Sequence, residues 1–453
     1  MQNIKKLNLN DRKIAVYGMG VSGLSALRML KALGAETIAI NSGEVKNWAK
    51  SPGVLDYTSI NNCYAEDDLH LPRVLDSVDL VILSPGIPRD HSLLESLHRK
   101  KIPVSGEIEL AYRYLESVGK CKPIIGITGT NGKTTTTTFL GEMIEMDHKK
   151  VFVGGNIGTP FCDYAFAILN GKPEVDFILL ELSSFQLESI DHFHVNVAMI
   201  LNLYQNHGER YTSIEDYGRA KFWITNHFTE NDVLIYPEDF PFVAEWALKQ
   251  KGKKRTVNTK HPVSAYDLSA FKLPGIHNKV NLNFILEAAE VIGLSPEAIQ
   301  KSINTFAGVH HRIEYVDGVS SLPHFKVYND AKSTNWDATL TAVKAMEGLG
   351  ELSLIIGGKK RGHGDSILPY LDFLKEHVKH FYLIGEMGDE IEAEIKGKVD
   401  YKKSGTLEAV VTEVRSLKTE KESVLLFSPG FPSFDQFKNY AQRGDHFMSL
   451  LRS

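Results

Sequence analysis

Cysteine is scarce in this chain, which has three cysteines in 453 residues and no CxxC pair. The odd number and the wide spacing of Cys63, Cys121 and Cys162 indicate neither a disulfide framework nor a zinc site. Long apolar runs are also absent, and the opening MQNIKKLNLN lacks the apolar core of a secretory signal. We therefore expect a protein of the reducing cytoplasm that does not enter a membrane.

A strong excess of charge of one sign is missing as well. The net charge is −5, which is small for this length and gives no case for binding nucleic acid or membranes. Internal repeats, low-complexity runs and long disordered linkers are not seen. The chain is too long for one core, and at about 150 residues per domain it should form about three domains.

Apolar, β-rich runs alternate with helical patterns along the chain. Many of the runs are apolar on both faces, as buried parallel strands must be, so we predict an α/β fold with parallel sheets. Helices are expected at 21–34 and 406–418. Seams at 117–123 and near 305–312 divide the chain into domains 1–118, 119–309 and 310–453. The predicted strands are 13–18, 36–41, 80–86, 123–129, 176–184, 196–203, 326–330, 352–358, 380–386 and 423–429.

The most informative run is IIGITGTNGKTTTTTFLGEMI at 124–144, in which an apolar strand enters a glycine-rich turn and a helix follows from Lys133. Gly129 and Gly132 allow a tight turn that aims backbone N–H groups at one anion. Lys133 would reach the β- and γ-phosphates of a nucleotide, and the Thr134 hydroxyl would bind Mg²⁺. Ile127 stands where the general phosphate-loop pattern has its first glycine, but the strand–loop–helix context favours nucleotide binding over a plain turn.

A second glycine motif, KIAVYGMGVSG at 13–23, has the GxGxxG spacing of dinucleotide-binding proteins. Such proteins need a carboxylate about 20 residues later for the ribose hydroxyls, and here the next strand ends in Asn41-Ser42-Gly43. The motif therefore favours a different nucleotide or a diphosphate over NAD, and glycines kept for helix–strand packing remain the alternative.

Polar residues follow several predicted strands, at the edge where open α/β sheets bind ligands. Glu181, at the end of a buried strand, is placed to hold Mg²⁺ if that strand neighbours the phosphate loop. His207 lies in a polar loop and could bind a metal or orient a carboxylate. Ser84 and Asn156 could equally belong to simple turns, and Lys221 would ordinarily be a solvated lysine on a helix.

Two further groups of residues are candidates for ligand contacts. Asn278 and Asn281 are three apart on a predicted helix, so both amides share one face, which suits either an adenine edge or a capped helix start. In the last domain, charged and hydroxyl side chains gather after predicted strands, namely Asp330, Lys332, Ser333, Thr334, the loop GGKKRG (357–362), Ser433 and Lys438.

With these motifs in hand, the chain resembles the Mur ligases, the ATP-dependent amide-forming enzymes of peptidoglycan precursor synthesis, along nearly its whole length. The tail at 433–444 is similar to that of the D-glutamate-adding branch, and no DNPR motif of the diamino-acid-adding branch is present. The matching motifs are GxGxSG (18–23), SPGIP (84–88), TGTNGKTT (128–135), GGNIG (154–158), ELSSFQL (181–187), RAK (219–221), GIHNxxN (275–281), HRxE (311–314), NDxKxTN (329–335) and SFDQFKNYxxRG (433–444).

The resemblance implies three sets of ligand contacts. ATP would be held by Gly129, Thr130, Asn131, Gly132, Lys133, Thr134, Thr135, Asn278, Asn281, Arg312 and Asp330. The substrate UDP-N-acetylmuramoyl-L-alanine would be held by Val21, Ser22, Asn41, Ser42, Ser84, Gly86 and Asn156. D-Glutamate would be held by Lys332, Thr334, Arg361, Ser433 and Tyr440.

The resemblance also implies cofactors and catalytic groups. Two Mg²⁺ ions are expected, with Thr134, Glu181, His207 and Lys221 as the metal-site residues. Lys221 matches the family's carbamylated lysine, in which CO₂ converts the cation into an anion. The catalytic residues would be Lys133, His207 and Lys221.

The fold that the family implies has three domains: a Rossmann-like first domain for the substrate, a P-loop ATPase-like central domain for ATP, and a Rossmann-like C-terminal domain for the amino acid. The substrate's alanine carboxylate would take the γ-phosphate of ATP, and the amine of D-glutamate would then displace phosphate. We expect a monomer whose domains close when the small-molecule substrates bind.

The sequence departs from the family pattern at several positions. Asn206 replaces the aspartate usual before the metal histidine, and Asn41-Ser42-Gly43 lacks the Asp-Thr-Arg of some relatives. Gly430-Phe431-Pro432 stands where Ala-Cys-Ala is usual, and Lys360 replaces an aspartate, which leaves Arg361 as the expected partner of the D-glutamate side-chain carboxylate. These changes bear more on amino-acid specificity than on ATP chemistry.

Three alternatives stay open at the level of sequence. A related ligase could add another amino acid, or add glutamates to folate. A non-catalytic nucleotide switch would use the same phosphate loop without ligation. A dehydrogenase is opposed by the missing ribose carboxylate after residue 41.

Overall fold

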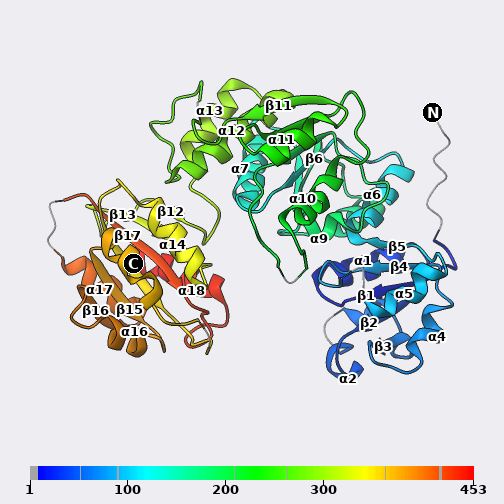
Figure 1. Cartoon of the computed structure of the whole chain (residues 1–453), viewed down its shortest axis with the longest axis horizontal. Coiled ribbons are helices and arrows are strands. Elements are labelled where there is room, and N and C mark those ends of the chain that lie inside the picture. Colours follow the sequence, from blue (N-terminus) through cyan, green and yellow to red (C-terminus); the bar gives the residue numbers. More distant parts are fainter. Residues whose placement is uncertain are drawn as a thin grey trace. The chain divides into compact units, whose positions relative to one another are not determined.

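The computed structural model describes residues 9–50, 53–88, 91–208, 210–262, 264–362, 364–417 and 421–453. The chain forms two compact units, Met1–Val263 with Asn281–Ile299, and Ser264–Val280 with Gln300–Ser453. The described strands make three sheets, of which two belong to the first unit and one to the second (Figure 1).

The first sheet has the strand order β3-β2-β1-β4-β5 and parallel pairing throughout. The order reverses between β1 and β4, so the loops after these two strands flank a topological switch point, where such sheets bind ligands. Its strands are β1 (Lys13–Tyr17), β2 (Glu36–Asn41), β3 (Cys63–Ala65), β4 (Leu80–Leu83) and β5 (Val104–Gly106). Its helices are α1 (Val21–Ala32), α2 (Val45–Trp48), α3 (Val54–Tyr57), α4 (Leu71–Leu75), α5 (Ser92–Arg99) and α6 (Glu107–Ser117), with the short helix η1 (Ile60–Asn62).

The second sheet has the order β11-β10-β9-β6-β8-β7, again with parallel pairing. Its strands are β6 (Ile124–Thr128), β7 (Val151–Gly155), β8 (Phe177–Glu181), β9 (Val197–Ile200), β10 (Val233–Pro237) and β11 (Lys253–Val257). The helices of this part of the chain are α7 (Lys133–Met146), α8 (Phe161–Leu169), α9 (Ser184–Leu187), α10 (Ile214–Phe222), η2 (Trp223–Thr225), α11 (Pro241–Leu248), α12 (Ile276–Val291) and α13 (Pro296–Thr305).

The third sheet has the order β12-β13-β17-β14-β15-β16, with β12 antiparallel to β13 and the other pairs parallel. Its strands are β12 (Glu314–Val316), β13 (Phe325–Asn329), β14 (Glu351–Gly357), β15 (His380–Ile384), β16 (Tyr401–Gly405) and β17 (Ser423–Gly430). Its helices are α14 (Trp336–Ala345), η3 (Leu368–Tyr370), α15 (Leu371–His377), α16 (Gly388–Ile395), α17 (Leu407–Ser416) and α18 (Tyr440–Arg452).

The predicted α/β class with parallel sheets is confirmed, and each strand predicted from the sequence coincides with a strand of the structure. The central strands β6, β8 and β9 are buried along almost their whole length, which explains their apolar residues on both faces. Of the described strands, those outside the ranges predicted above are β3, β5, β7, β10, β11, β12 and β16. The proposed domain boundaries at 118 and 309 stay predictions.

Helix α6 links the first sheet to the second through buried carboxylates. Glu109, 1% exposed, accepts hydrogen bonds from the backbone N–H groups of Asp191, His192 and Phe193, each at 2.9 Å. Glu107 accepts from the N–H of Cys162 at the start of α8, and α6 packs along α8. Because three donors depend on one carboxylate, Glu109 fastens the two parts of this unit together.

Replacing Glu109 with glutamine should therefore destabilise the first unit. The amide would turn an N–H₂ group toward backbone donors, and we expect a loss of about 2 kcal/mol in the free energy of unfolding. Urea unfolding measures this change, with the exposed Glu95→Gln as the matched control. Equal unfolding midpoints for the two variants would contradict the role given to Glu109.

None of the helices in the described ranges combines the length and the apolar composition of a membrane span.

Candidate functional site

The glycine-rich turn 129–132, in which the sequence predicts phosphate binding and which is called the phosphate turn below, joins β6 to α7 as expected. Gly129 has φ 148° and Gly132, the residue before the helix, has φ 84°, so both occupy backbone conformations that favour glycine. Helix α7 begins at Lys133 and presents the N–H groups of its first turn and its positive dipole end to the glycine turn. The turn is therefore shaped to receive an anion.

Two lysines converge on one carbonyl of this turn. Lys133 Nζ donates to Gly129 O at 2.8 Å and to Thr130 O at 2.9 Å, while Lys221 Nζ donates to the same Gly129 O at 3.0 Å. Lys221 lies on α10, 88 positions after Lys133 in the chain. Because both lysines donate to Gly129 O, the fold brings their side chains together at the turn. A negatively charged ligand in the turn would meet both side chains.

Lys221 is buried, which overturns the ordinary reading of a solvated lysine. It is 1% exposed, and its Nζ lies 4.3 Å from the centre of the Tyr217 ring. Burial, assisted by the neighbouring Lys133 charge and opposed by Glu181, lowers the pKa of Lys221 to about 6. At neutral pH the amine is therefore largely uncharged, a state in which it is a nucleophile.

Glu181 lies where the sequence predicted, because β8 pairs directly with β6 and Glu181 is opposite Ile127. Its side chain is 2% exposed, and Oε1 accepts a hydrogen bond from Asn156 Nδ2 at 2.8 Å. Oε2 is buried and has no hydrogen-bond partner within the described ranges. An unpartnered buried carboxylate oxygen is costly, and a bound cation would compensate it. Asn156, expected at the uridine diphosphate site, contacts this carboxylate.

His207 lies in the loop after β9, in a left-handed backbone conformation with φ 55°. Asn206 Oδ1 accepts from the His207 N–H at 2.9 Å, and the imidazole ring packs at 4.8 Å from Phe185 and 5.8 Å from Tyr217. Tyr217 also contacts Lys221, so the side chains of His207 and Lys221 pack against the same aromatic ring.

Asn281 on α12 is buried beside the phosphate turn. A Cβ atom added to Gly132 would lie 2.5 Å from Asn281 Oδ1, so glycine is required for this close approach. Asn278, three residues earlier on the same helix, donates from Nδ2 to Pro274 O at 2.6 Å. Of the two amides expected at the adenine, that of Asn281 therefore lies against the phosphate turn, whereas that of Asn278 is hydrogen-bonded to the backbone before α12.

The glycine loop of the first sheet is braced by two of the predicted residues. Met19 N–H donates to Asn41 Oδ1 at 3.0 Å, and Ser84 Oγ donates to Gly18 O at 2.6 Å. A Cβ at Gly23 would lie 1.8 Å from Gly18 O, so this glycine serves helix–strand packing. Val21, Ser42 and Gly86 are exposed and Ser22 is half-buried, around the switch point between β1 and β4.

Arg210 is a residue that the sequence analysis missed. Its guanidinium donates to Pro85 O at 3.0 Å, pairs with Glu188 and lies over the Phe185 ring at 4.3 Å. It thereby ties the Ser84–Pro88 loop of the first sheet to the loop that carries His207. A polar residue in a polar loop gave no sequence signal for this contact.

In the second unit, the predicted residues lie after neighbouring strands, since β17 pairs with both β13 and β14. Asp330, directly after β13, is 4% exposed and accepts from Ser428 Oγ at 2.7 Å and from Ile313 N–H at 3.1 Å. Burial raises the pKa of Asp330 to about 7, against the opposing effect of the Ser428 hydrogen bond. Arg312 has a buried Nε without a hydrogen-bond partner in the part of the chain that is described.

Arg361 is already engaged by its own domain. Its Nε pairs with Asp365 Oδ1 at 3.0 Å, and its NH1 donates to Thr334 O at 2.7 Å. Lys332 Nζ lies 5.6 Å from the Tyr440 ring centre, and Ser433 is buried. The structure thus groups Thr334 with Arg361, and Lys332 with Tyr440.

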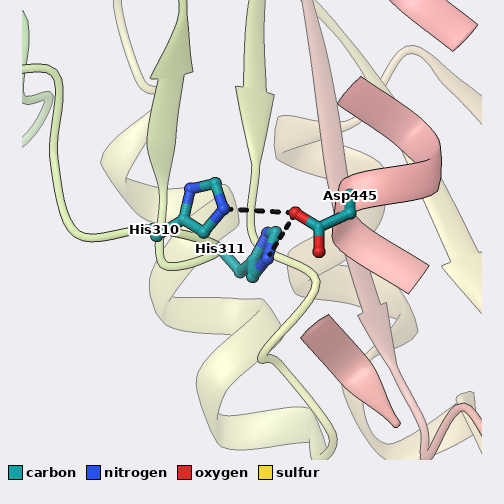
Figure 2. A group of neighbouring side chains, drawn as sticks. All are labelled: His310, His311 and Asp445. Carbon is teal, nitrogen blue, oxygen red and sulfur yellow. Dashed lines mark hydrogen bonds and ion pairs between the residues drawn. The ribbon is translucent and has the colours of Figure 1, made fainter. Parts of the chain in front are cut away.

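Figure 2 shows a cluster of side chains that the sequence analysis did not single out, in which Asp445 of α18 faces His310 and His311. Asp445 Oδ1 lies 3.2 Å from His310 Nε2 and 3.4 Å from His311 Nε2. His310 Nδ1 lies 2.9 Å from Glu314 Oε1. The three ligand atoms lie within 4.8 Å of one another, a spacing that a metal ion could bridge.

The hydrogen bonds around His311 argue against a metal at this cluster. Asn329 Oδ1 accepts from Ala331 N–H at 3.2 Å, which directs Asn329 Nδ2 to donate to His311 Nδ1 at 2.9 Å. The proton of neutral His311 is then on Nε2, the atom that a metal would need. The cluster is therefore an ion-paired network that fastens the segment before β12 to α18.

Asp445→Asn should weaken the second unit in a pH-dependent way. Burial lowers the pKa of His310, but its pairs with Glu314 and Asp445 outweigh this effect, and the net pKa is raised. The stabilisation is then fully present below the unfolded pKa of about 6.5 and is lost as pH rises through the higher folded pKa. Urea unfolding should show a larger defect at acidic than at alkaline pH, whereas the exposed Glu347→Gln control shows little at either. A defect independent of pH would contradict this account.

Comparisons with known proteins give a consistent picture. The Mur ligase middle domain matches residues 127–291. The UDP-N-acetylmuramoylalanine–D-glutamate ligase of Geotalea daltonii is 33% identical, covering 99% of this chain and 98% of the relative. The enzyme of the same name from Koribacter versatilis is 34% identical, with 98% of each chain covered. Among solved structures, the MurF ligase from Thermotoga maritima in complex with ADP aligns with a TM-score of 0.57 at 15% identity, covering 99% of this chain and 97% of that one.

The structural likeness confirms the three-domain α/β fold, and the identity over nearly the full length shows common descent with the named ligases. The chain therefore belongs to the Mur ligase family.

Proposed function

We propose that this protein is the ATP-dependent ligase that joins D-glutamate to UDP-N-acetylmuramoyl-L-alanine in peptidoglycan precursor synthesis. The observation that carries the proposal is the likeness to curated ligases of this name, 33–34% identical over 98–99% of the chain. The use of ATP is supported by the phosphate turn, on which Lys133 and Lys221 converge, and by Glu181 at the end of the neighbouring strand.

The proposed reaction has two steps. The alanine carboxylate attacks the γ-phosphorus of ATP, and ADP leaves, so that an acyl phosphate forms. The amine of D-glutamate then attacks the acyl carbon and loses a proton. The bond between the acyl carbon and the phosphate oxygen breaks, and phosphate leaves with the electron pair of that bond. A carboxylate is a poor acyl donor, and phosphorylation supplies its leaving group. In this scheme Lys133 offsets the charge on the transferred phosphoryl group, where most of the catalysis comes from positioning and electrostatics.

ATP would be held by the turn Gly129–Thr135, with Asn278 and Asn281 at the adenine and Arg312 and Asp330 from the C-terminal domain. Support comes from the N–H groups at the start of α7 and from the closeness of Asn281 to Gly132. In the proposed reaction Arg312 and Asp330 contact the nucleotide in the closed enzyme, as the family resemblance implies.

Mg²⁺ fits the residues present. The buried Glu181 Oε2 is without a hydrogen-bond partner in the described chain, and Thr134, His207 and a modified Lys221 would complete two sites. When bound, Mg²⁺ neutralises phosphate oxygens that would otherwise repel the attacking carboxylate. Asn206 offers a neutral amide in place of the usual aspartate, so the site near His207 would bind its ion more weakly.

The substrate's uridine diphosphate would lie at the switch point of the first sheet, against Val21, Ser22, Asn41, Ser42, Ser84 and Gly86, with Asn156 toward the phosphate turn. D-Glutamate would meet Lys332, Thr334, Arg361, Ser433 and Tyr440. Arg361 also pairs with Asp365, so a D-glutamate carboxylate at Arg361 would compete with the Asp365 carboxylate. We also propose that the protein acts as a monomer in the cytoplasm, where ATP is available.

One experiment decides the function. The protein is mixed with UDP-N-acetylmuramoyl-L-alanine, ATP, Mg²⁺ and each of a panel of amino acids, and phosphate release and product mass are recorded. We expect product with D-glutamate, and none when any co-substrate is omitted. A better acceptor than D-glutamate, or folate glutamylation, would replace this proposal with that of a related ligase. ATP binding without turnover would leave a nucleotide switch.

A further inference from the structure

The phosphate turn is held from the side by a residue that the proposed function leaves unused. Asn202 lies two residues after β9, the strand that pairs with β6 on the side opposite to β8. Its Oδ1 accepts from Thr130 N–H at 3.1 Å and from Asn131 N–H at 2.9 Å. Its Nδ2 donates to Asn131 O at 3.0 Å. One amide side chain thus makes three hydrogen bonds to two residues of the turn.

The adjoining residues extend this contact. Thr130 N–H also approaches Asn202 O at 3.2 Å. Thr130 Oγ1 accepts from Tyr204 N–H at 3.0 Å and donates to Tyr204 O at 3.3 Å. The segments 129–131 and 202–204, more than 70 positions apart, are therefore hydrogen-bonded as one unit, and the second of them leads into the loop of His207.

The pattern of these bonds decides which N–H groups remain for a ligand. The N–H groups of Thr130 and Asn131 are already occupied by Asn202. The anion must then be met by the N–H groups that follow Gly132, at the start of α7, and by Lys133. Asn202 fixes the turn in the shape that presents those groups, so that little of the binding free energy is spent on ordering it.

We infer that Asn202 is a positioning residue for ATP, which holds the phosphate turn ready for the triphosphate and couples it to the His207 loop. The inference rests on the proposed use of ATP at this turn. Asn202 does not touch the reacting atoms, and it acts through Thr130 and Asn131. Its loss should raise the KM for ATP and lower kcat, because both binding and the alignment of the γ-phosphate depend on the turn.

The chain supplies a matched control at the other end of the same strand. Asn196 Oδ1 accepts from Ile124 N–H at 2.9 Å, so it also ties the β9 segment to β6, at the edge away from the phosphate turn. Asn196→Ala and Asn202→Ala remove side-chain hydrogen bonds between the same two strand regions. Only the second change reaches the turn, so the pair separates loss of stability from loss of positioning.

The test measures MgATP and MgADP binding by titration calorimetry on the full-length protein, without D-glutamate. Thermal unfolding and binding of UDP-N-acetylmuramoyl-L-alanine are recorded alongside. We expect Asn202→Ala to weaken MgATP binding by about tenfold. Asn196→Ala should keep the parental affinity for MgATP, and both variants should keep the affinity for the UDP substrate. Equal nucleotide affinities of Asn202→Ala and Asn196→Ala would overturn the inference.

Asn202→Asp provides a second test that does not depend on how the alanine variant folds. The carboxylate can still accept from Thr130 and Asn131 N–H, but its other oxygen faces Asn131 O and adds negative charge beside the phosphates. We expect a greater loss of affinity for MgATP than for MgADP, and a partial recovery at high salt. Parental affinity in this variant would also overturn the inference.

Failure of the inference can be told apart from failure of the proposed function. If the parent protein binds ATP but does not join D-glutamate, the proposed function fails, and the comparison of Asn202 with Asn196 still stands. If the parent joins D-glutamate and Asn202→Ala behaves as the parent does, the inference alone fails.

Discussion

Lys133→Ala is expected to reduce the rate of ligation by at least about a thousandfold, the scale seen when a charge that stabilises a transferred phosphoryl group is removed. In the structure its ammonium group donates to two carbonyls of the phosphate turn, Gly129 O and Thr130 O, at the start of α7. A triphosphate in the turn would offer this cation stronger acceptors than neutral carbonyls, so we expect the side chain to move to the phosphates.

The measurement is single-turnover formation of acyl phosphate with saturating ATP, because a defect there isolates phosphoryl transfer from nucleotide binding. The exposed Lys172→Ala serves as the control for loss of one lysine. Lys133→Arg should recover little of the rate of acyl phosphate formation, because the planar guanidinium is larger than the compact ammonium group of lysine. If Lys133→Ala ligates at the parental rate, the phosphate turn is not the ATP site and the proposed mechanism is wrong.

Ligation should also depend on dissolved CO₂, through Lys221. Its amine is buried, and its pKa is lowered to about 6 by burial first and by Lys133 second. At pH 7 most of the amine is uncharged and can attack CO₂ to give a carbamate, with release of one proton. As pH falls through 6 the amine becomes protonated and unreactive, so carbamate formation should decline over that range.

We expect activity at pH 7 to fall when the enzyme is kept in CO₂-free buffer, and to return when bicarbonate is added at the same pH. Mass spectrometry under non-denaturing conditions would follow the increment of one CO₂. Lys221→Arg cannot form the carbamate and introduces a permanent positive charge, and the rate of ligation should drop by about a hundredfold or more. Lys221→Glu restores a negative charge at this position, so its rate of ligation should fall less than that of Lys221→Arg. The exposed Lys251→Arg is the matched control, and a Lys221→Arg enzyme with parental activity would exclude the carbamate.

The fold was well predicted from the sequence where burial on both faces leaves an apolar run, as in β6, β8 and β9. Strands β11 (KKRTV) and β16 (YKKSG) escaped prediction because each is an edge strand. Charged side chains on an edge strand prevent pairing with other chains and erase the apolar pattern. The interpretation of Glu181 depended on the condition that β8 neighbours β6, and the structure meets this condition.

The site was predicted less completely. Lys221 did carry a signal, since Ile214, Tyr217 and Ile224 recur at helical spacing with it and mark the face of α10 and η2 on which it lies. Contacts between distant segments left no such pattern. The three hydrogen bonds of Asn202, the contact of Arg210 with Pro85 and the pairing of Asp365 with Arg361 follow from tertiary structure. The family resemblance named Lys221 but none of these.

The hydrogen bonds of the Glu109 carboxylate on α6 should couple the thermal unfolding of the first two sheets. Three backbone donors from residues 191–193 lose their shared acceptor as soon as the first two sheets separate. If one of these sheets unfolded alone, the Glu109 carboxylate and the three backbone N–H groups would lose their hydrogen bonds. The first and second sheets should therefore unfold in one cooperative transition. A heating scan of the ligand-free protein would accordingly show two heat-absorption peaks, although the polypeptide has three domains.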